Sequence, residues 1–241
     1  MGAPPRAPSR RALNLLSAGA AQGLVEALHA RFEAEAQAVL GVRFGAIGAL
    51  REALAGGAPC DVLIVSDTML RELAAAGAIR DASRRPIGAV RTGVAVRAGE
   101  PVPRLDGAAA LRAALLAATA LHVPDLARST AGAHVASVLE RLGVRDALEL
   151  KLSLHANGAA AMQALAQHGP AGAVGLTQIT EIRRTSGLVL AGALPEPFGL
   201  TTVYAAGIAA ETAEPALAER LVALLSGAAT AALRRDLAFE P

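Results

Sequence analysis

The sequence predicts an α/β protein in which the strands of a mostly parallel sheet alternate with helices. The first observation is that short apolar runs, such as 39–44 and 61–65, alternate with longer amphipathic stretches along almost the whole chain of 241 residues. This alternation is typical of parallel strands joined by crossover helices. The second observation is that two long strand patterns, at 90–97 and 201–208, bracket a middle module. We therefore expect two lobes, a chain that crosses between them and returns, and a ligand cleft between the lobes.

The first part of the chain is predicted to repeat one unit, a buried strand that ends in small or hydroxyl residues and leads into a helix. The helix expected at 21–38 carries Leu24, Leu28 and Phe32 on one face, at the spacing of an amphipathic helix. The unit recurs twice, and this predicts strands at 13–16, 39–44 and 61–65, a helix at 50–55 and a further helix that starts at Ser66-Asp67-Thr68.

The second part repeats this layout after a strand at 90–97 whose alternating pattern is less buried. Short apolar runs predict strands, and the stretches with helical spacing that follow them predict helices. In order, we expect a helix at 106–118, a strand at 120–123, a helix at 133–142, strands at 150–154 and 173–176 with a helix at 159–167 between them, the strand at 201–208, and two closing helices.

These elements divide the chain into a tail and two lobes. We expect a disordered tail at 1–11, a discontinuous lobe I from 12–88 plus 205–241, and a lobe II from 89–204. The long strands near 90–97 and 201–208 are expected to serve as the hinge.

Composition excludes several classes of function. Aromatic residues make up 2% of the chain and Trp is absent, so carbohydrate and single-stranded nucleic acid have few stacking platforms. The net charge is +2 and the arginines are dispersed along the sequence, so no basic cluster indicates nucleic-acid binding. Hydrophobic residues reach 53%, but no uninterrupted apolar run is long enough to insert in a membrane. We expect a monomer.

The sequence predicts no metal site, no cofactor and no disulfide. His29, His134 and His168 have no acidic or cysteine partner at metal-binding spacing. Cys60 is the single cysteine and lies at the start of an apolar run, so we expect it to pack as a small hydrophobic residue.

The segment 1–11 is basic and proline-rich but is not followed by an apolar segment of signal-peptide length. As written, the chain is expected to be cytoplasmic. If a leader was lost, the protein is expected to be periplasmic.

The start of the first helix has the features of an anion-binding site. Ser17, Ala18 and Gly19 follow the opening strand, and small residues at a helix start let an oxyanion approach unpaired backbone N–H groups at the positive end of the helix dipole. A simpler alternative is that Ser17 is a helix N-cap. Similar junctions end the next two strands, and the carboxyl ends of parallel strands share one edge of a sheet. This convergence favours the anion site.

The chain resembles the type II periplasmic solute-binding proteins, in the branch that is similar to molybdate-binding proteins. The stretches that carry the resemblance are LNLLSAGA, GAIGAL, PCDVLIVS, GVAVRAGEPVP, PDLARSTAGAHVASVLERLG, GAVGLTQITEI, TVYAAGIAA and the terminal FEP. The resemblance implies a two-lobed fold, an oxyanion clamped by hydroxyls and backbone amides from both lobes, and an ABC permease as partner. The residues expected to bind the ligand are Ser17, Ala18, Ala46, Ile47, Ser66, Ser129, Thr130, Asn157, Thr177, Gln178 and Tyr204.

One departure from the resemblance concerns the identity of the anion. The typical molybdate receptor has a second serine in the turn after the second strand, where this chain has Ala46-Ile47-Gly48. The binding protein is therefore expected to capture a small oxyanion or carboxylate that the sequence does not identify.

The same branch includes aconitate isomerase, which supplies the alternative function. A cofactor-independent isomerase of a di- or tricarboxylate needs a base and an acid for proton transfer. His155 and Asp125 are the catalytic candidates, although Asp125 also suits its turn and a lone His is often structural. The other titratable groups expected near the cleft are Asp67, Glu181 and Tyr204, of which Asp67 could be an N-cap and Glu181 could serve only the helix dipole.

Overall fold

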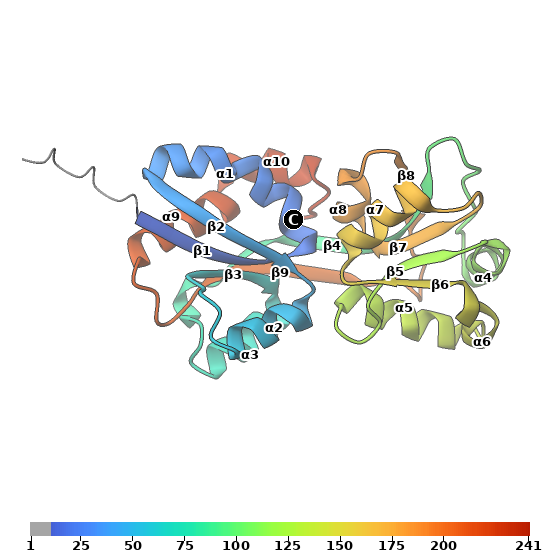
Figure 1. Ribbon diagram of the computed structural model, residues 1–241, viewed down its shortest axis with the longest axis horizontal. Coiled ribbons are helices and arrows are strands. Elements are labelled where there is room, and N and C mark those ends of the chain that lie inside the picture. The colour runs from blue at the N-terminus through green and yellow to red at the C-terminus, as the bar shows by residue number, and fades with distance from the viewer. Residues whose placement is uncertain (1–10) are drawn as a thin grey trace, which may run out of the picture.

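Two lobes lie side by side in the computed structural model, joined by the long strands β4 (Arg85–Arg97) and β9 (Thr201–Ile208) (Figure 1). The structure describes residues 11–241. β4 and β9 pair antiparallel, from Arg85 with Ala206 to Arg91 with Thr201. This pair passes through the waist of the molecule.

The first lobe is built on three parallel strands. β1 (Arg11–Ala18) lies between β2 (Ala38–Gly45) and β3 (Val62–Ser66), and β3 pairs antiparallel with β9. The helical segments of this lobe are η1 (Gly19–Ala21), α1 (Gln22–Ala36), α2 (Ile47–Ala55), α3 (Asp67–Ala75), η2 (Asp81–Ser83), α9 (Pro215–Ser226), η4 (Ala228–Thr230) and α10 (Ala231–Asp236).

The second lobe repeats the parallel arrangement. β5 (Leu121–Pro124) lies between β6 (Leu152–His155) and β7 (Val174–Gln178), and β4 pairs antiparallel with both β7 and β8 (Leu188–Ala193). The helical segments are α4 (Ala108–Ala117), α5 (Thr130–Arg141), α6 (Arg145–Leu148), η3 (Glu149–Lys151), α7 (Gly158–His168) and α8 (Ile179–Arg184).

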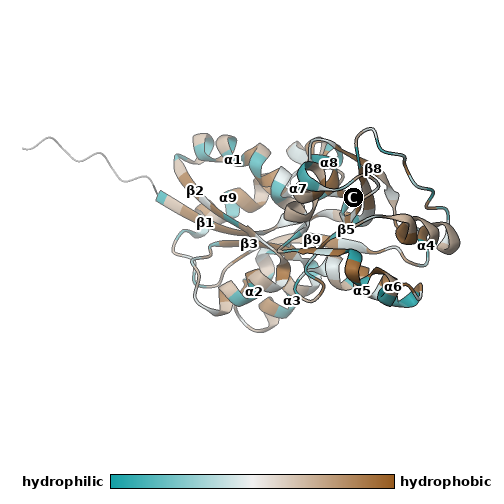
Figure 2. Cartoon of the chain, turned by 45° about the vertical axis from the view of Figure 1, so that its right-hand side comes forward, coloured by the Kyte–Doolittle hydropathy of each residue, from teal (hydrophilic) through white to brown (hydrophobic). Residues whose placement is uncertain are grey.

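Each lobe has its own hydrophobic core. Leu13, Leu24 and Ile64 belong to the first-lobe core, whereas Leu121 and Leu176 belong to the second. Figure 2 shows the apolar residues of the central strands, with hydrophilic residues on the outer turns of the surrounding helices. Burying one apolar face of each helix against a sheet is the arrangement that the alternating pattern predicted.

The predicted α/β fold class is confirmed, with local differences. β8 was not predicted, because its six residues LVLAGA are only partly buried and show no clear alternation. β4 begins five residues before the predicted strand, at Arg85, and contains a register shift between Pro86 and Gly88. Arg11, the last residue of the predicted tail, opens β1, and residues 1–10 lie outside the described part of the chain. The lobe boundaries and the hinge remain predictions.

Within residues 11–241, no single helix has both the length and the apolar composition to cross a membrane. The helices Pro215–Ser226 and Ala228–Asp236 meet both conditions when they are taken together, but the pair is bent by 48°.

Burial raises the pKa of the Cys60 thiol to about 12, so the thiol is protonated at neutral pH, as expected for a packing residue.

The buried carboxylate of Asp61 ties together segments that are distant in sequence. One oxygen accepts hydrogen bonds from the backbone N–H of Asn14 at 2.7 Å and its side-chain amide at 3.0 Å. The other oxygen accepts from the Thr212 hydroxyl at 2.6 Å. Asp61 thereby joins β1 to the segment that follows β9.

Asp61→Ala is expected to lower the free energy of unfolding by about 1–3 kcal/mol, because it leaves buried donors of Asn14 and Thr212 without an acceptor. Urea unfolding measures this change. The control is Asp106→Ala, which removes a carboxylate from an exposed ion pair with Arg104 and is expected to leave stability almost unchanged. Equal effects of the two variants would contradict the role assigned to Asp61.

Candidate functional site

A small cavity lies between the lobes, where strands and helices of both meet. Its volume is about 20 Å³, which is room for a single water molecule. The first lobe contributes Ala18, Gly19, Ala20, Gly45, Ala46, Ile47 and Tyr204, and the second contributes Ser129, Thr130, Ala131, Asn157, Gly158, Gln178 and Glu181. This lining contains no Lys or Arg.

Besides the short α8, whose N-cap is Gln178, three longer helices begin at this cavity. α2 starts after Ala46, α5 after Ser129 and α7 after Asn157. Two of these caps use side chains, because the Ser129 hydroxyl accepts from the Gly132 N–H at 3.4 Å and the Asn157 oxygen accepts from the Ala160 N–H at 2.9 Å. The positive ends of three helix dipoles therefore converge on this cavity. Such an arrangement favours an anion.

Glu181 places a carboxyl group in the wall of the same cavity. It is 4% exposed and lies in the first turn of α8. Its Oε2 accepts a hydrogen bond from the Thr177 hydroxyl at 2.6 Å, and the backbone N–H groups of Gln178 and Ala159 also bond to the carboxyl. Burial raises the pKa of Glu181, and these donors offset only part of the rise.

Gly19 and Gly158 leave space for this carboxyl. A Cβ on Gly158 would lie 1.9 Å from Oε2 of Glu181 and 2.0 Å from the Thr177 hydroxyl oxygen. A Cβ on Gly19 would lie 2.5 Å from Oε1. Oε2 is thus held inside the second lobe, while Oε1 faces the first lobe.

Tyr204 and Gln178 complete the polar lining. Both are buried, and burial is the main reason that the pKa of Tyr204 is raised, with the negative charge of Glu181 adding to it. The side chain of Gln178 hydrogen-bonds the Tyr204 phenol, and its Nε2 donates to the Thr202 hydroxyl at 3.4 Å. Its Oε1 has no hydrogen-bond partner within the described residues. An unpartnered buried acceptor beside a cavity is a group that a ligand proton or a water can satisfy.

The structure brings together eight of the predicted ligand-binding residues. They come from both lobes and are Ala18, Ala46, Ile47, Ser129, Thr130, Asn157, Gln178 and Tyr204.

Ser17, Ser66 and Thr177 were predicted to bind ligand but lie outside the cavity lining. Successive side chains of a strand point to opposite faces, so Ala18 reaches the cavity while Ser17 is fully buried and donates to the Ala18 carbonyl at 3.2 Å. Ser17 is not a helix cap either, because η1 begins one residue later. Ser66 caps α3 through the Met69 N–H at 3.4 Å, and Thr177 is bonded to Glu181.

The catalytic candidates Asp125 and His155 also lie outside the lining. Asp125 accepts from the N–H groups of Ala127 and Arg128 at 2.8 and 2.9 Å, and these bonds lower its pKa. His155 stacks on His122 with ring nitrogens 3.2 Å apart, and burial lowers the pKa of both imidazoles. Sequence reasoning placed Glu181 among the titratable groups near the cleft but left open a role for the helix dipole alone, because the depth of this carboxyl in the cleft depends on tertiary packing.

Several contacts connect the two lobes across the cleft. The Gly48 N–H donates to the Arg128 carbonyl at 2.9 Å, and the Arg128 side chain forms an ion pair with Glu52. Arg184 pairs with Glu26 at 2.7 Å. These cations lie at the rim of the cleft, so the cavity itself stays uncharged apart from Glu181.

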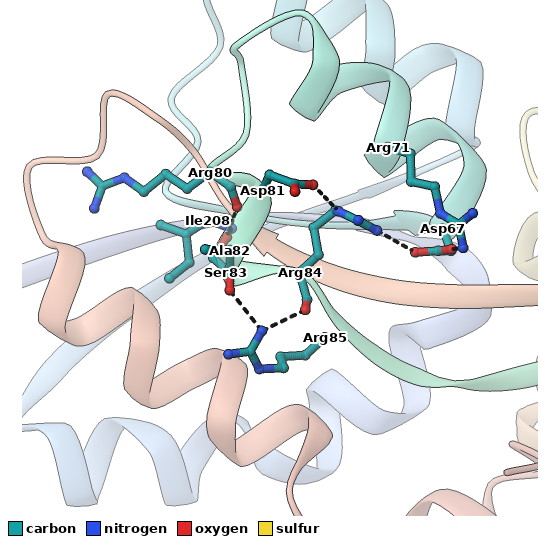
Figure 3. Close-up of polar contacts among 9 residues, drawn as sticks. All are labelled: Asp67, Arg71, Arg80, Asp81, Ala82, Ser83, Arg84, Arg85 and Ile208. Atoms are coloured by element: carbon teal, nitrogen blue, oxygen red, sulfur yellow. Dashed lines mark hydrogen bonds and ion pairs between the residues drawn. The ribbon is translucent and has the colours of Figure 1, made fainter.

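A larger hollow of about 410 Å³ lies beside η2, β9 and α9, within the first lobe. Its two arginines are Arg80, which donates to the Ala210 carbonyl at 3.0 Å, and Arg85, whose contacts with the neighbouring Arg84 are drawn in Figure 3. Arg84 binds Asp81 at 2.8 Å and Asp67 at 3.2 Å, and Arg85 donates to the carbonyls of Ala82 and Arg84. Asp67 is therefore an ion-pair partner rather than a cleft residue.

Among residues 11–241, no group of three or more His, Cys, Asp or Glu side chains is arranged to hold a metal ion. A cavity between two lobes, surrounded by helix starts and neutral hydrogen-bond donors, is the arrangement of a two-lobed ligand-binding protein. The chain belongs to the family of bacterial extracellular solute-binding proteins, whose family model matches residues 13–236.

The comparisons with individual proteins agree with this family. The chain is 24% identical over 194 residues to aconitate isomerase from a Pseudomonas species, covering 80% of this chain and 72% of that protein. The periplasmic molybdate-binding protein of Azotobacter vinelandii superposes with a TM-score of 0.78 at 20% identity, over 95% of this chain and 99% of that chain. The sulfate-binding protein SubI of Mycobacterium tuberculosis H37Rv gives 0.76 at 17% identity, over 96% and 87%. The two-lobed fold is thereby confirmed.

Gly158→Ala is expected to displace the Glu181 carboxyl and to lower the free energy of unfolding by about 1–3 kcal/mol, because the new methyl group overlaps two oxygens. The control is Gly23→Ala within α1, where the nearest atom to a Cβ is 3.6 Å away. That change is expected to be neutral or slightly stabilising. Chemical unfolding of both variants measures the difference, and a neutral Gly158→Ala would contradict the packing described.

Proposed function

We propose that this chain captures a small oxyanion or carboxylate in the interlobe cavity and delivers it to an ABC permease. The observation that supports this proposal is the convergence of three helix starts, from both lobes, on a polar cavity whose lining has no Lys or Arg. Neutral dipoles can satisfy an anion without the cost of desolvating a buried cation. Each hydrogen bond to a charged acceptor contributes roughly 1.5–3 kcal/mol.

Binding requires the cavity to widen, since an oxyanion has several non-hydrogen atoms and about 20 Å³ accommodates one water. A rotation of the lobes about β4 and β9 is the motion that we propose. The rim contacts of Arg128 with Glu52 and of Arg184 with Glu26 would break when the lobes separate and form again when the lobes close over a ligand.

The relatives guide the choice of ligand, location and assembly. The names of the solved relatives state that one binds molybdate and one binds sulfate. The Ala46-Ile47 turn offers backbone N–H groups but no second hydroxyl, so molybdate is one candidate among several oxyanions. We propose a monomer located outside the cytoplasm, as in the periplasmic relative; the comparisons give no support to the cytoplasmic expectation.

An isomerase of a small tricarboxylate is the second candidate, favoured by the similarity to aconitate isomerase. Proton transfer needs a titratable group at the ligand. Glu181 and Tyr204 line the cavity, whereas Asp125 and His155 do not, so Glu181 would take the role of base. Proton NMR of the chain mixed with either aconitate isomer tests this function. Conversion by the wild type and not by Glu181→Gln would support the isomerase, and no conversion would reject it.

Oxyanion binding is expected to raise the melting temperature in a screen of molybdate, tungstate, sulfate, phosphate, citrate and aconitate. A ligand at 100 times its Kd adds about 2.7 kcal/mol to the free energy of unfolding. Thr130→Val is expected to weaken the best ligand by about tenfold or more, because the hydroxyl of a lining residue is lost.

The matched control is Thr68→Val, an exposed residue in the first turn of α3. This variant is expected to bind with wild-type affinity. If none of the anions raises the melting temperature at millimolar concentration, the proposed function is wrong.

A further inference from the structure

We propose that Glu181 determines which oxyanions the cavity accepts, by sharing one proton with the bound ligand. The site would then favour oxyanions that carry an O–H group at neutral pH, of which the phosphate type is the representative, over sulfate and molybdate. This inference rests on the proposed function of oxyanion binding.

The position of the carboxyl carries the argument. Oε1 of Glu181 faces Gly19, so an anion that enters between the helix starts meets this oxygen. Oε2 is held by the Thr177 hydroxyl at 2.6 Å, so the carboxyl cannot turn away without losing that bond. The backbone N–H of Ala159 in the first turn of α7 already donates to Glu181, within the same set of donors that an anion would use.

No cation in the cavity offsets the charge of Glu181. Arg184, on the same helix, contributes only a minor electrostatic effect and is paired with Glu26 at 2.7 Å. Two anionic groups in contact inside a poorly solvated cavity repel each other strongly. A carboxylate and an oxyanion can therefore occupy this space together only when one proton lies between them.

The elements packed against α8 do not supply another charge to the cavity. η1, β7 and β8 have no ionisable side chains, and α7 has only His168 at its far end. β9 contributes the neutral phenol of Tyr204. The remaining ionisable groups of these elements are on α1, namely Glu26, His29, Arg31, Glu33 and Glu35, and on β4, namely Arg85, Arg91 and Arg97; none of them lines the cavity.

The unpartnered Oε1 of Gln178 is a second acceptor in the lining that a ligand O–H can satisfy. Gln178 is 2% exposed and lines the cavity beside Glu181. Its amide oxygen is an acceptor, and a fully ionised oxyanion has no hydrogen to offer it. A ligand O–H satisfies one of these two acceptors, Glu181 or Gln178. The raised pKa of Glu181 agrees with a group that binds a proton readily when the lobes close.

The direction of the pH dependence follows from this proton. Sulfate carries no proton in this pH range, so Glu181 must bind a proton from solvent when sulfate binds. Above the pKa of Glu181 in the open protein, sulfate affinity is expected to fall about tenfold per pH unit. Phosphate keeps an O–H group throughout pH 6–9 and supplies the proton itself, so its affinity is expected to change by less than about threefold between pH 8 and 9.

The experiment measures the Kd of inorganic phosphate, sulfate and molybdate by calorimetry at pH 6, 7, 8 and 9, for the wild type and Glu181→Gln. The amide keeps the bond from Thr177 and offers N–H groups to any oxyanion, so the variant is expected to bind sulfate independently of pH and to lose at least tenfold of the phosphate-over-sulfate preference. Glu211→Gln, an exposed site, is the matched control.

Calorimetry of the wild type in two buffers of different ionisation enthalpy measures proton uptake on binding and needs no variant. At pH 8, about one proton is expected per sulfate and none per phosphate.

Each outcome is decisive. If sulfate and phosphate bind with the same pH profile and without proton uptake, the role of Glu181 is overturned while oxyanion binding stands. If neither the wild type nor the variant binds any of the three anions, the proposed function fails and this inference fails with it.

Discussion

The pairing of β4 with β9 is the constraint on which the rest of the structure depends. Both strands run from one lobe into the other (Figure 1), and Tyr204 of β9 lines the interlobe cavity. Val90 is buried in the first-lobe core and Val94 in the second, only four residues further along β4. The lobe rotation that we propose for ligand entry would therefore be absorbed within a short segment of paired backbone.

The two-lobed geometry places the arginine–glutamate ion pairs at the rim of the cleft and the neutral donors in the cavity. At the rim, Arg128 and Arg184 pair across the cleft with Glu52 and Glu26, where water screens them and each pair contributes little. In the cavity, the positive potential comes from helix starts and hydroxyls, which lose less hydration on burial than arginine does. Glu181 is the one carboxylic acid in the lining, and its burial raises its pKa.

Several features of the site could be read from the sequence because they are local. Ser129 and Asn157 cap α5 and α7 as their residue types favour, and eight of the predicted ligand-binding residues line the cavity. Ser17 was misplaced by a single position, because a short η1 turn replaces the expected helix start and strand alternation turns its side chain into the core. β8 was missed because its pairing with the end of β4 depends on a partner more than ninety residues away, between Leu188 and Arg97.

The sequence by itself determined the α/β class, the repeated strand-to-helix units, the two-lobed arrangement and the small residues at the helix starts. These follow from hydrophobic periodicity and capping preferences, which act between neighbours in the chain. Only the tertiary structure decided that Glu181 lies in the lining of the interlobe cavity and that Asp125 and His155 do not. The physical reason is that the burial of a carboxyl depends on segments such as Gly19 and Gly158, which come to Glu181 from other parts of the sequence and exclude water there only once both lobes have folded.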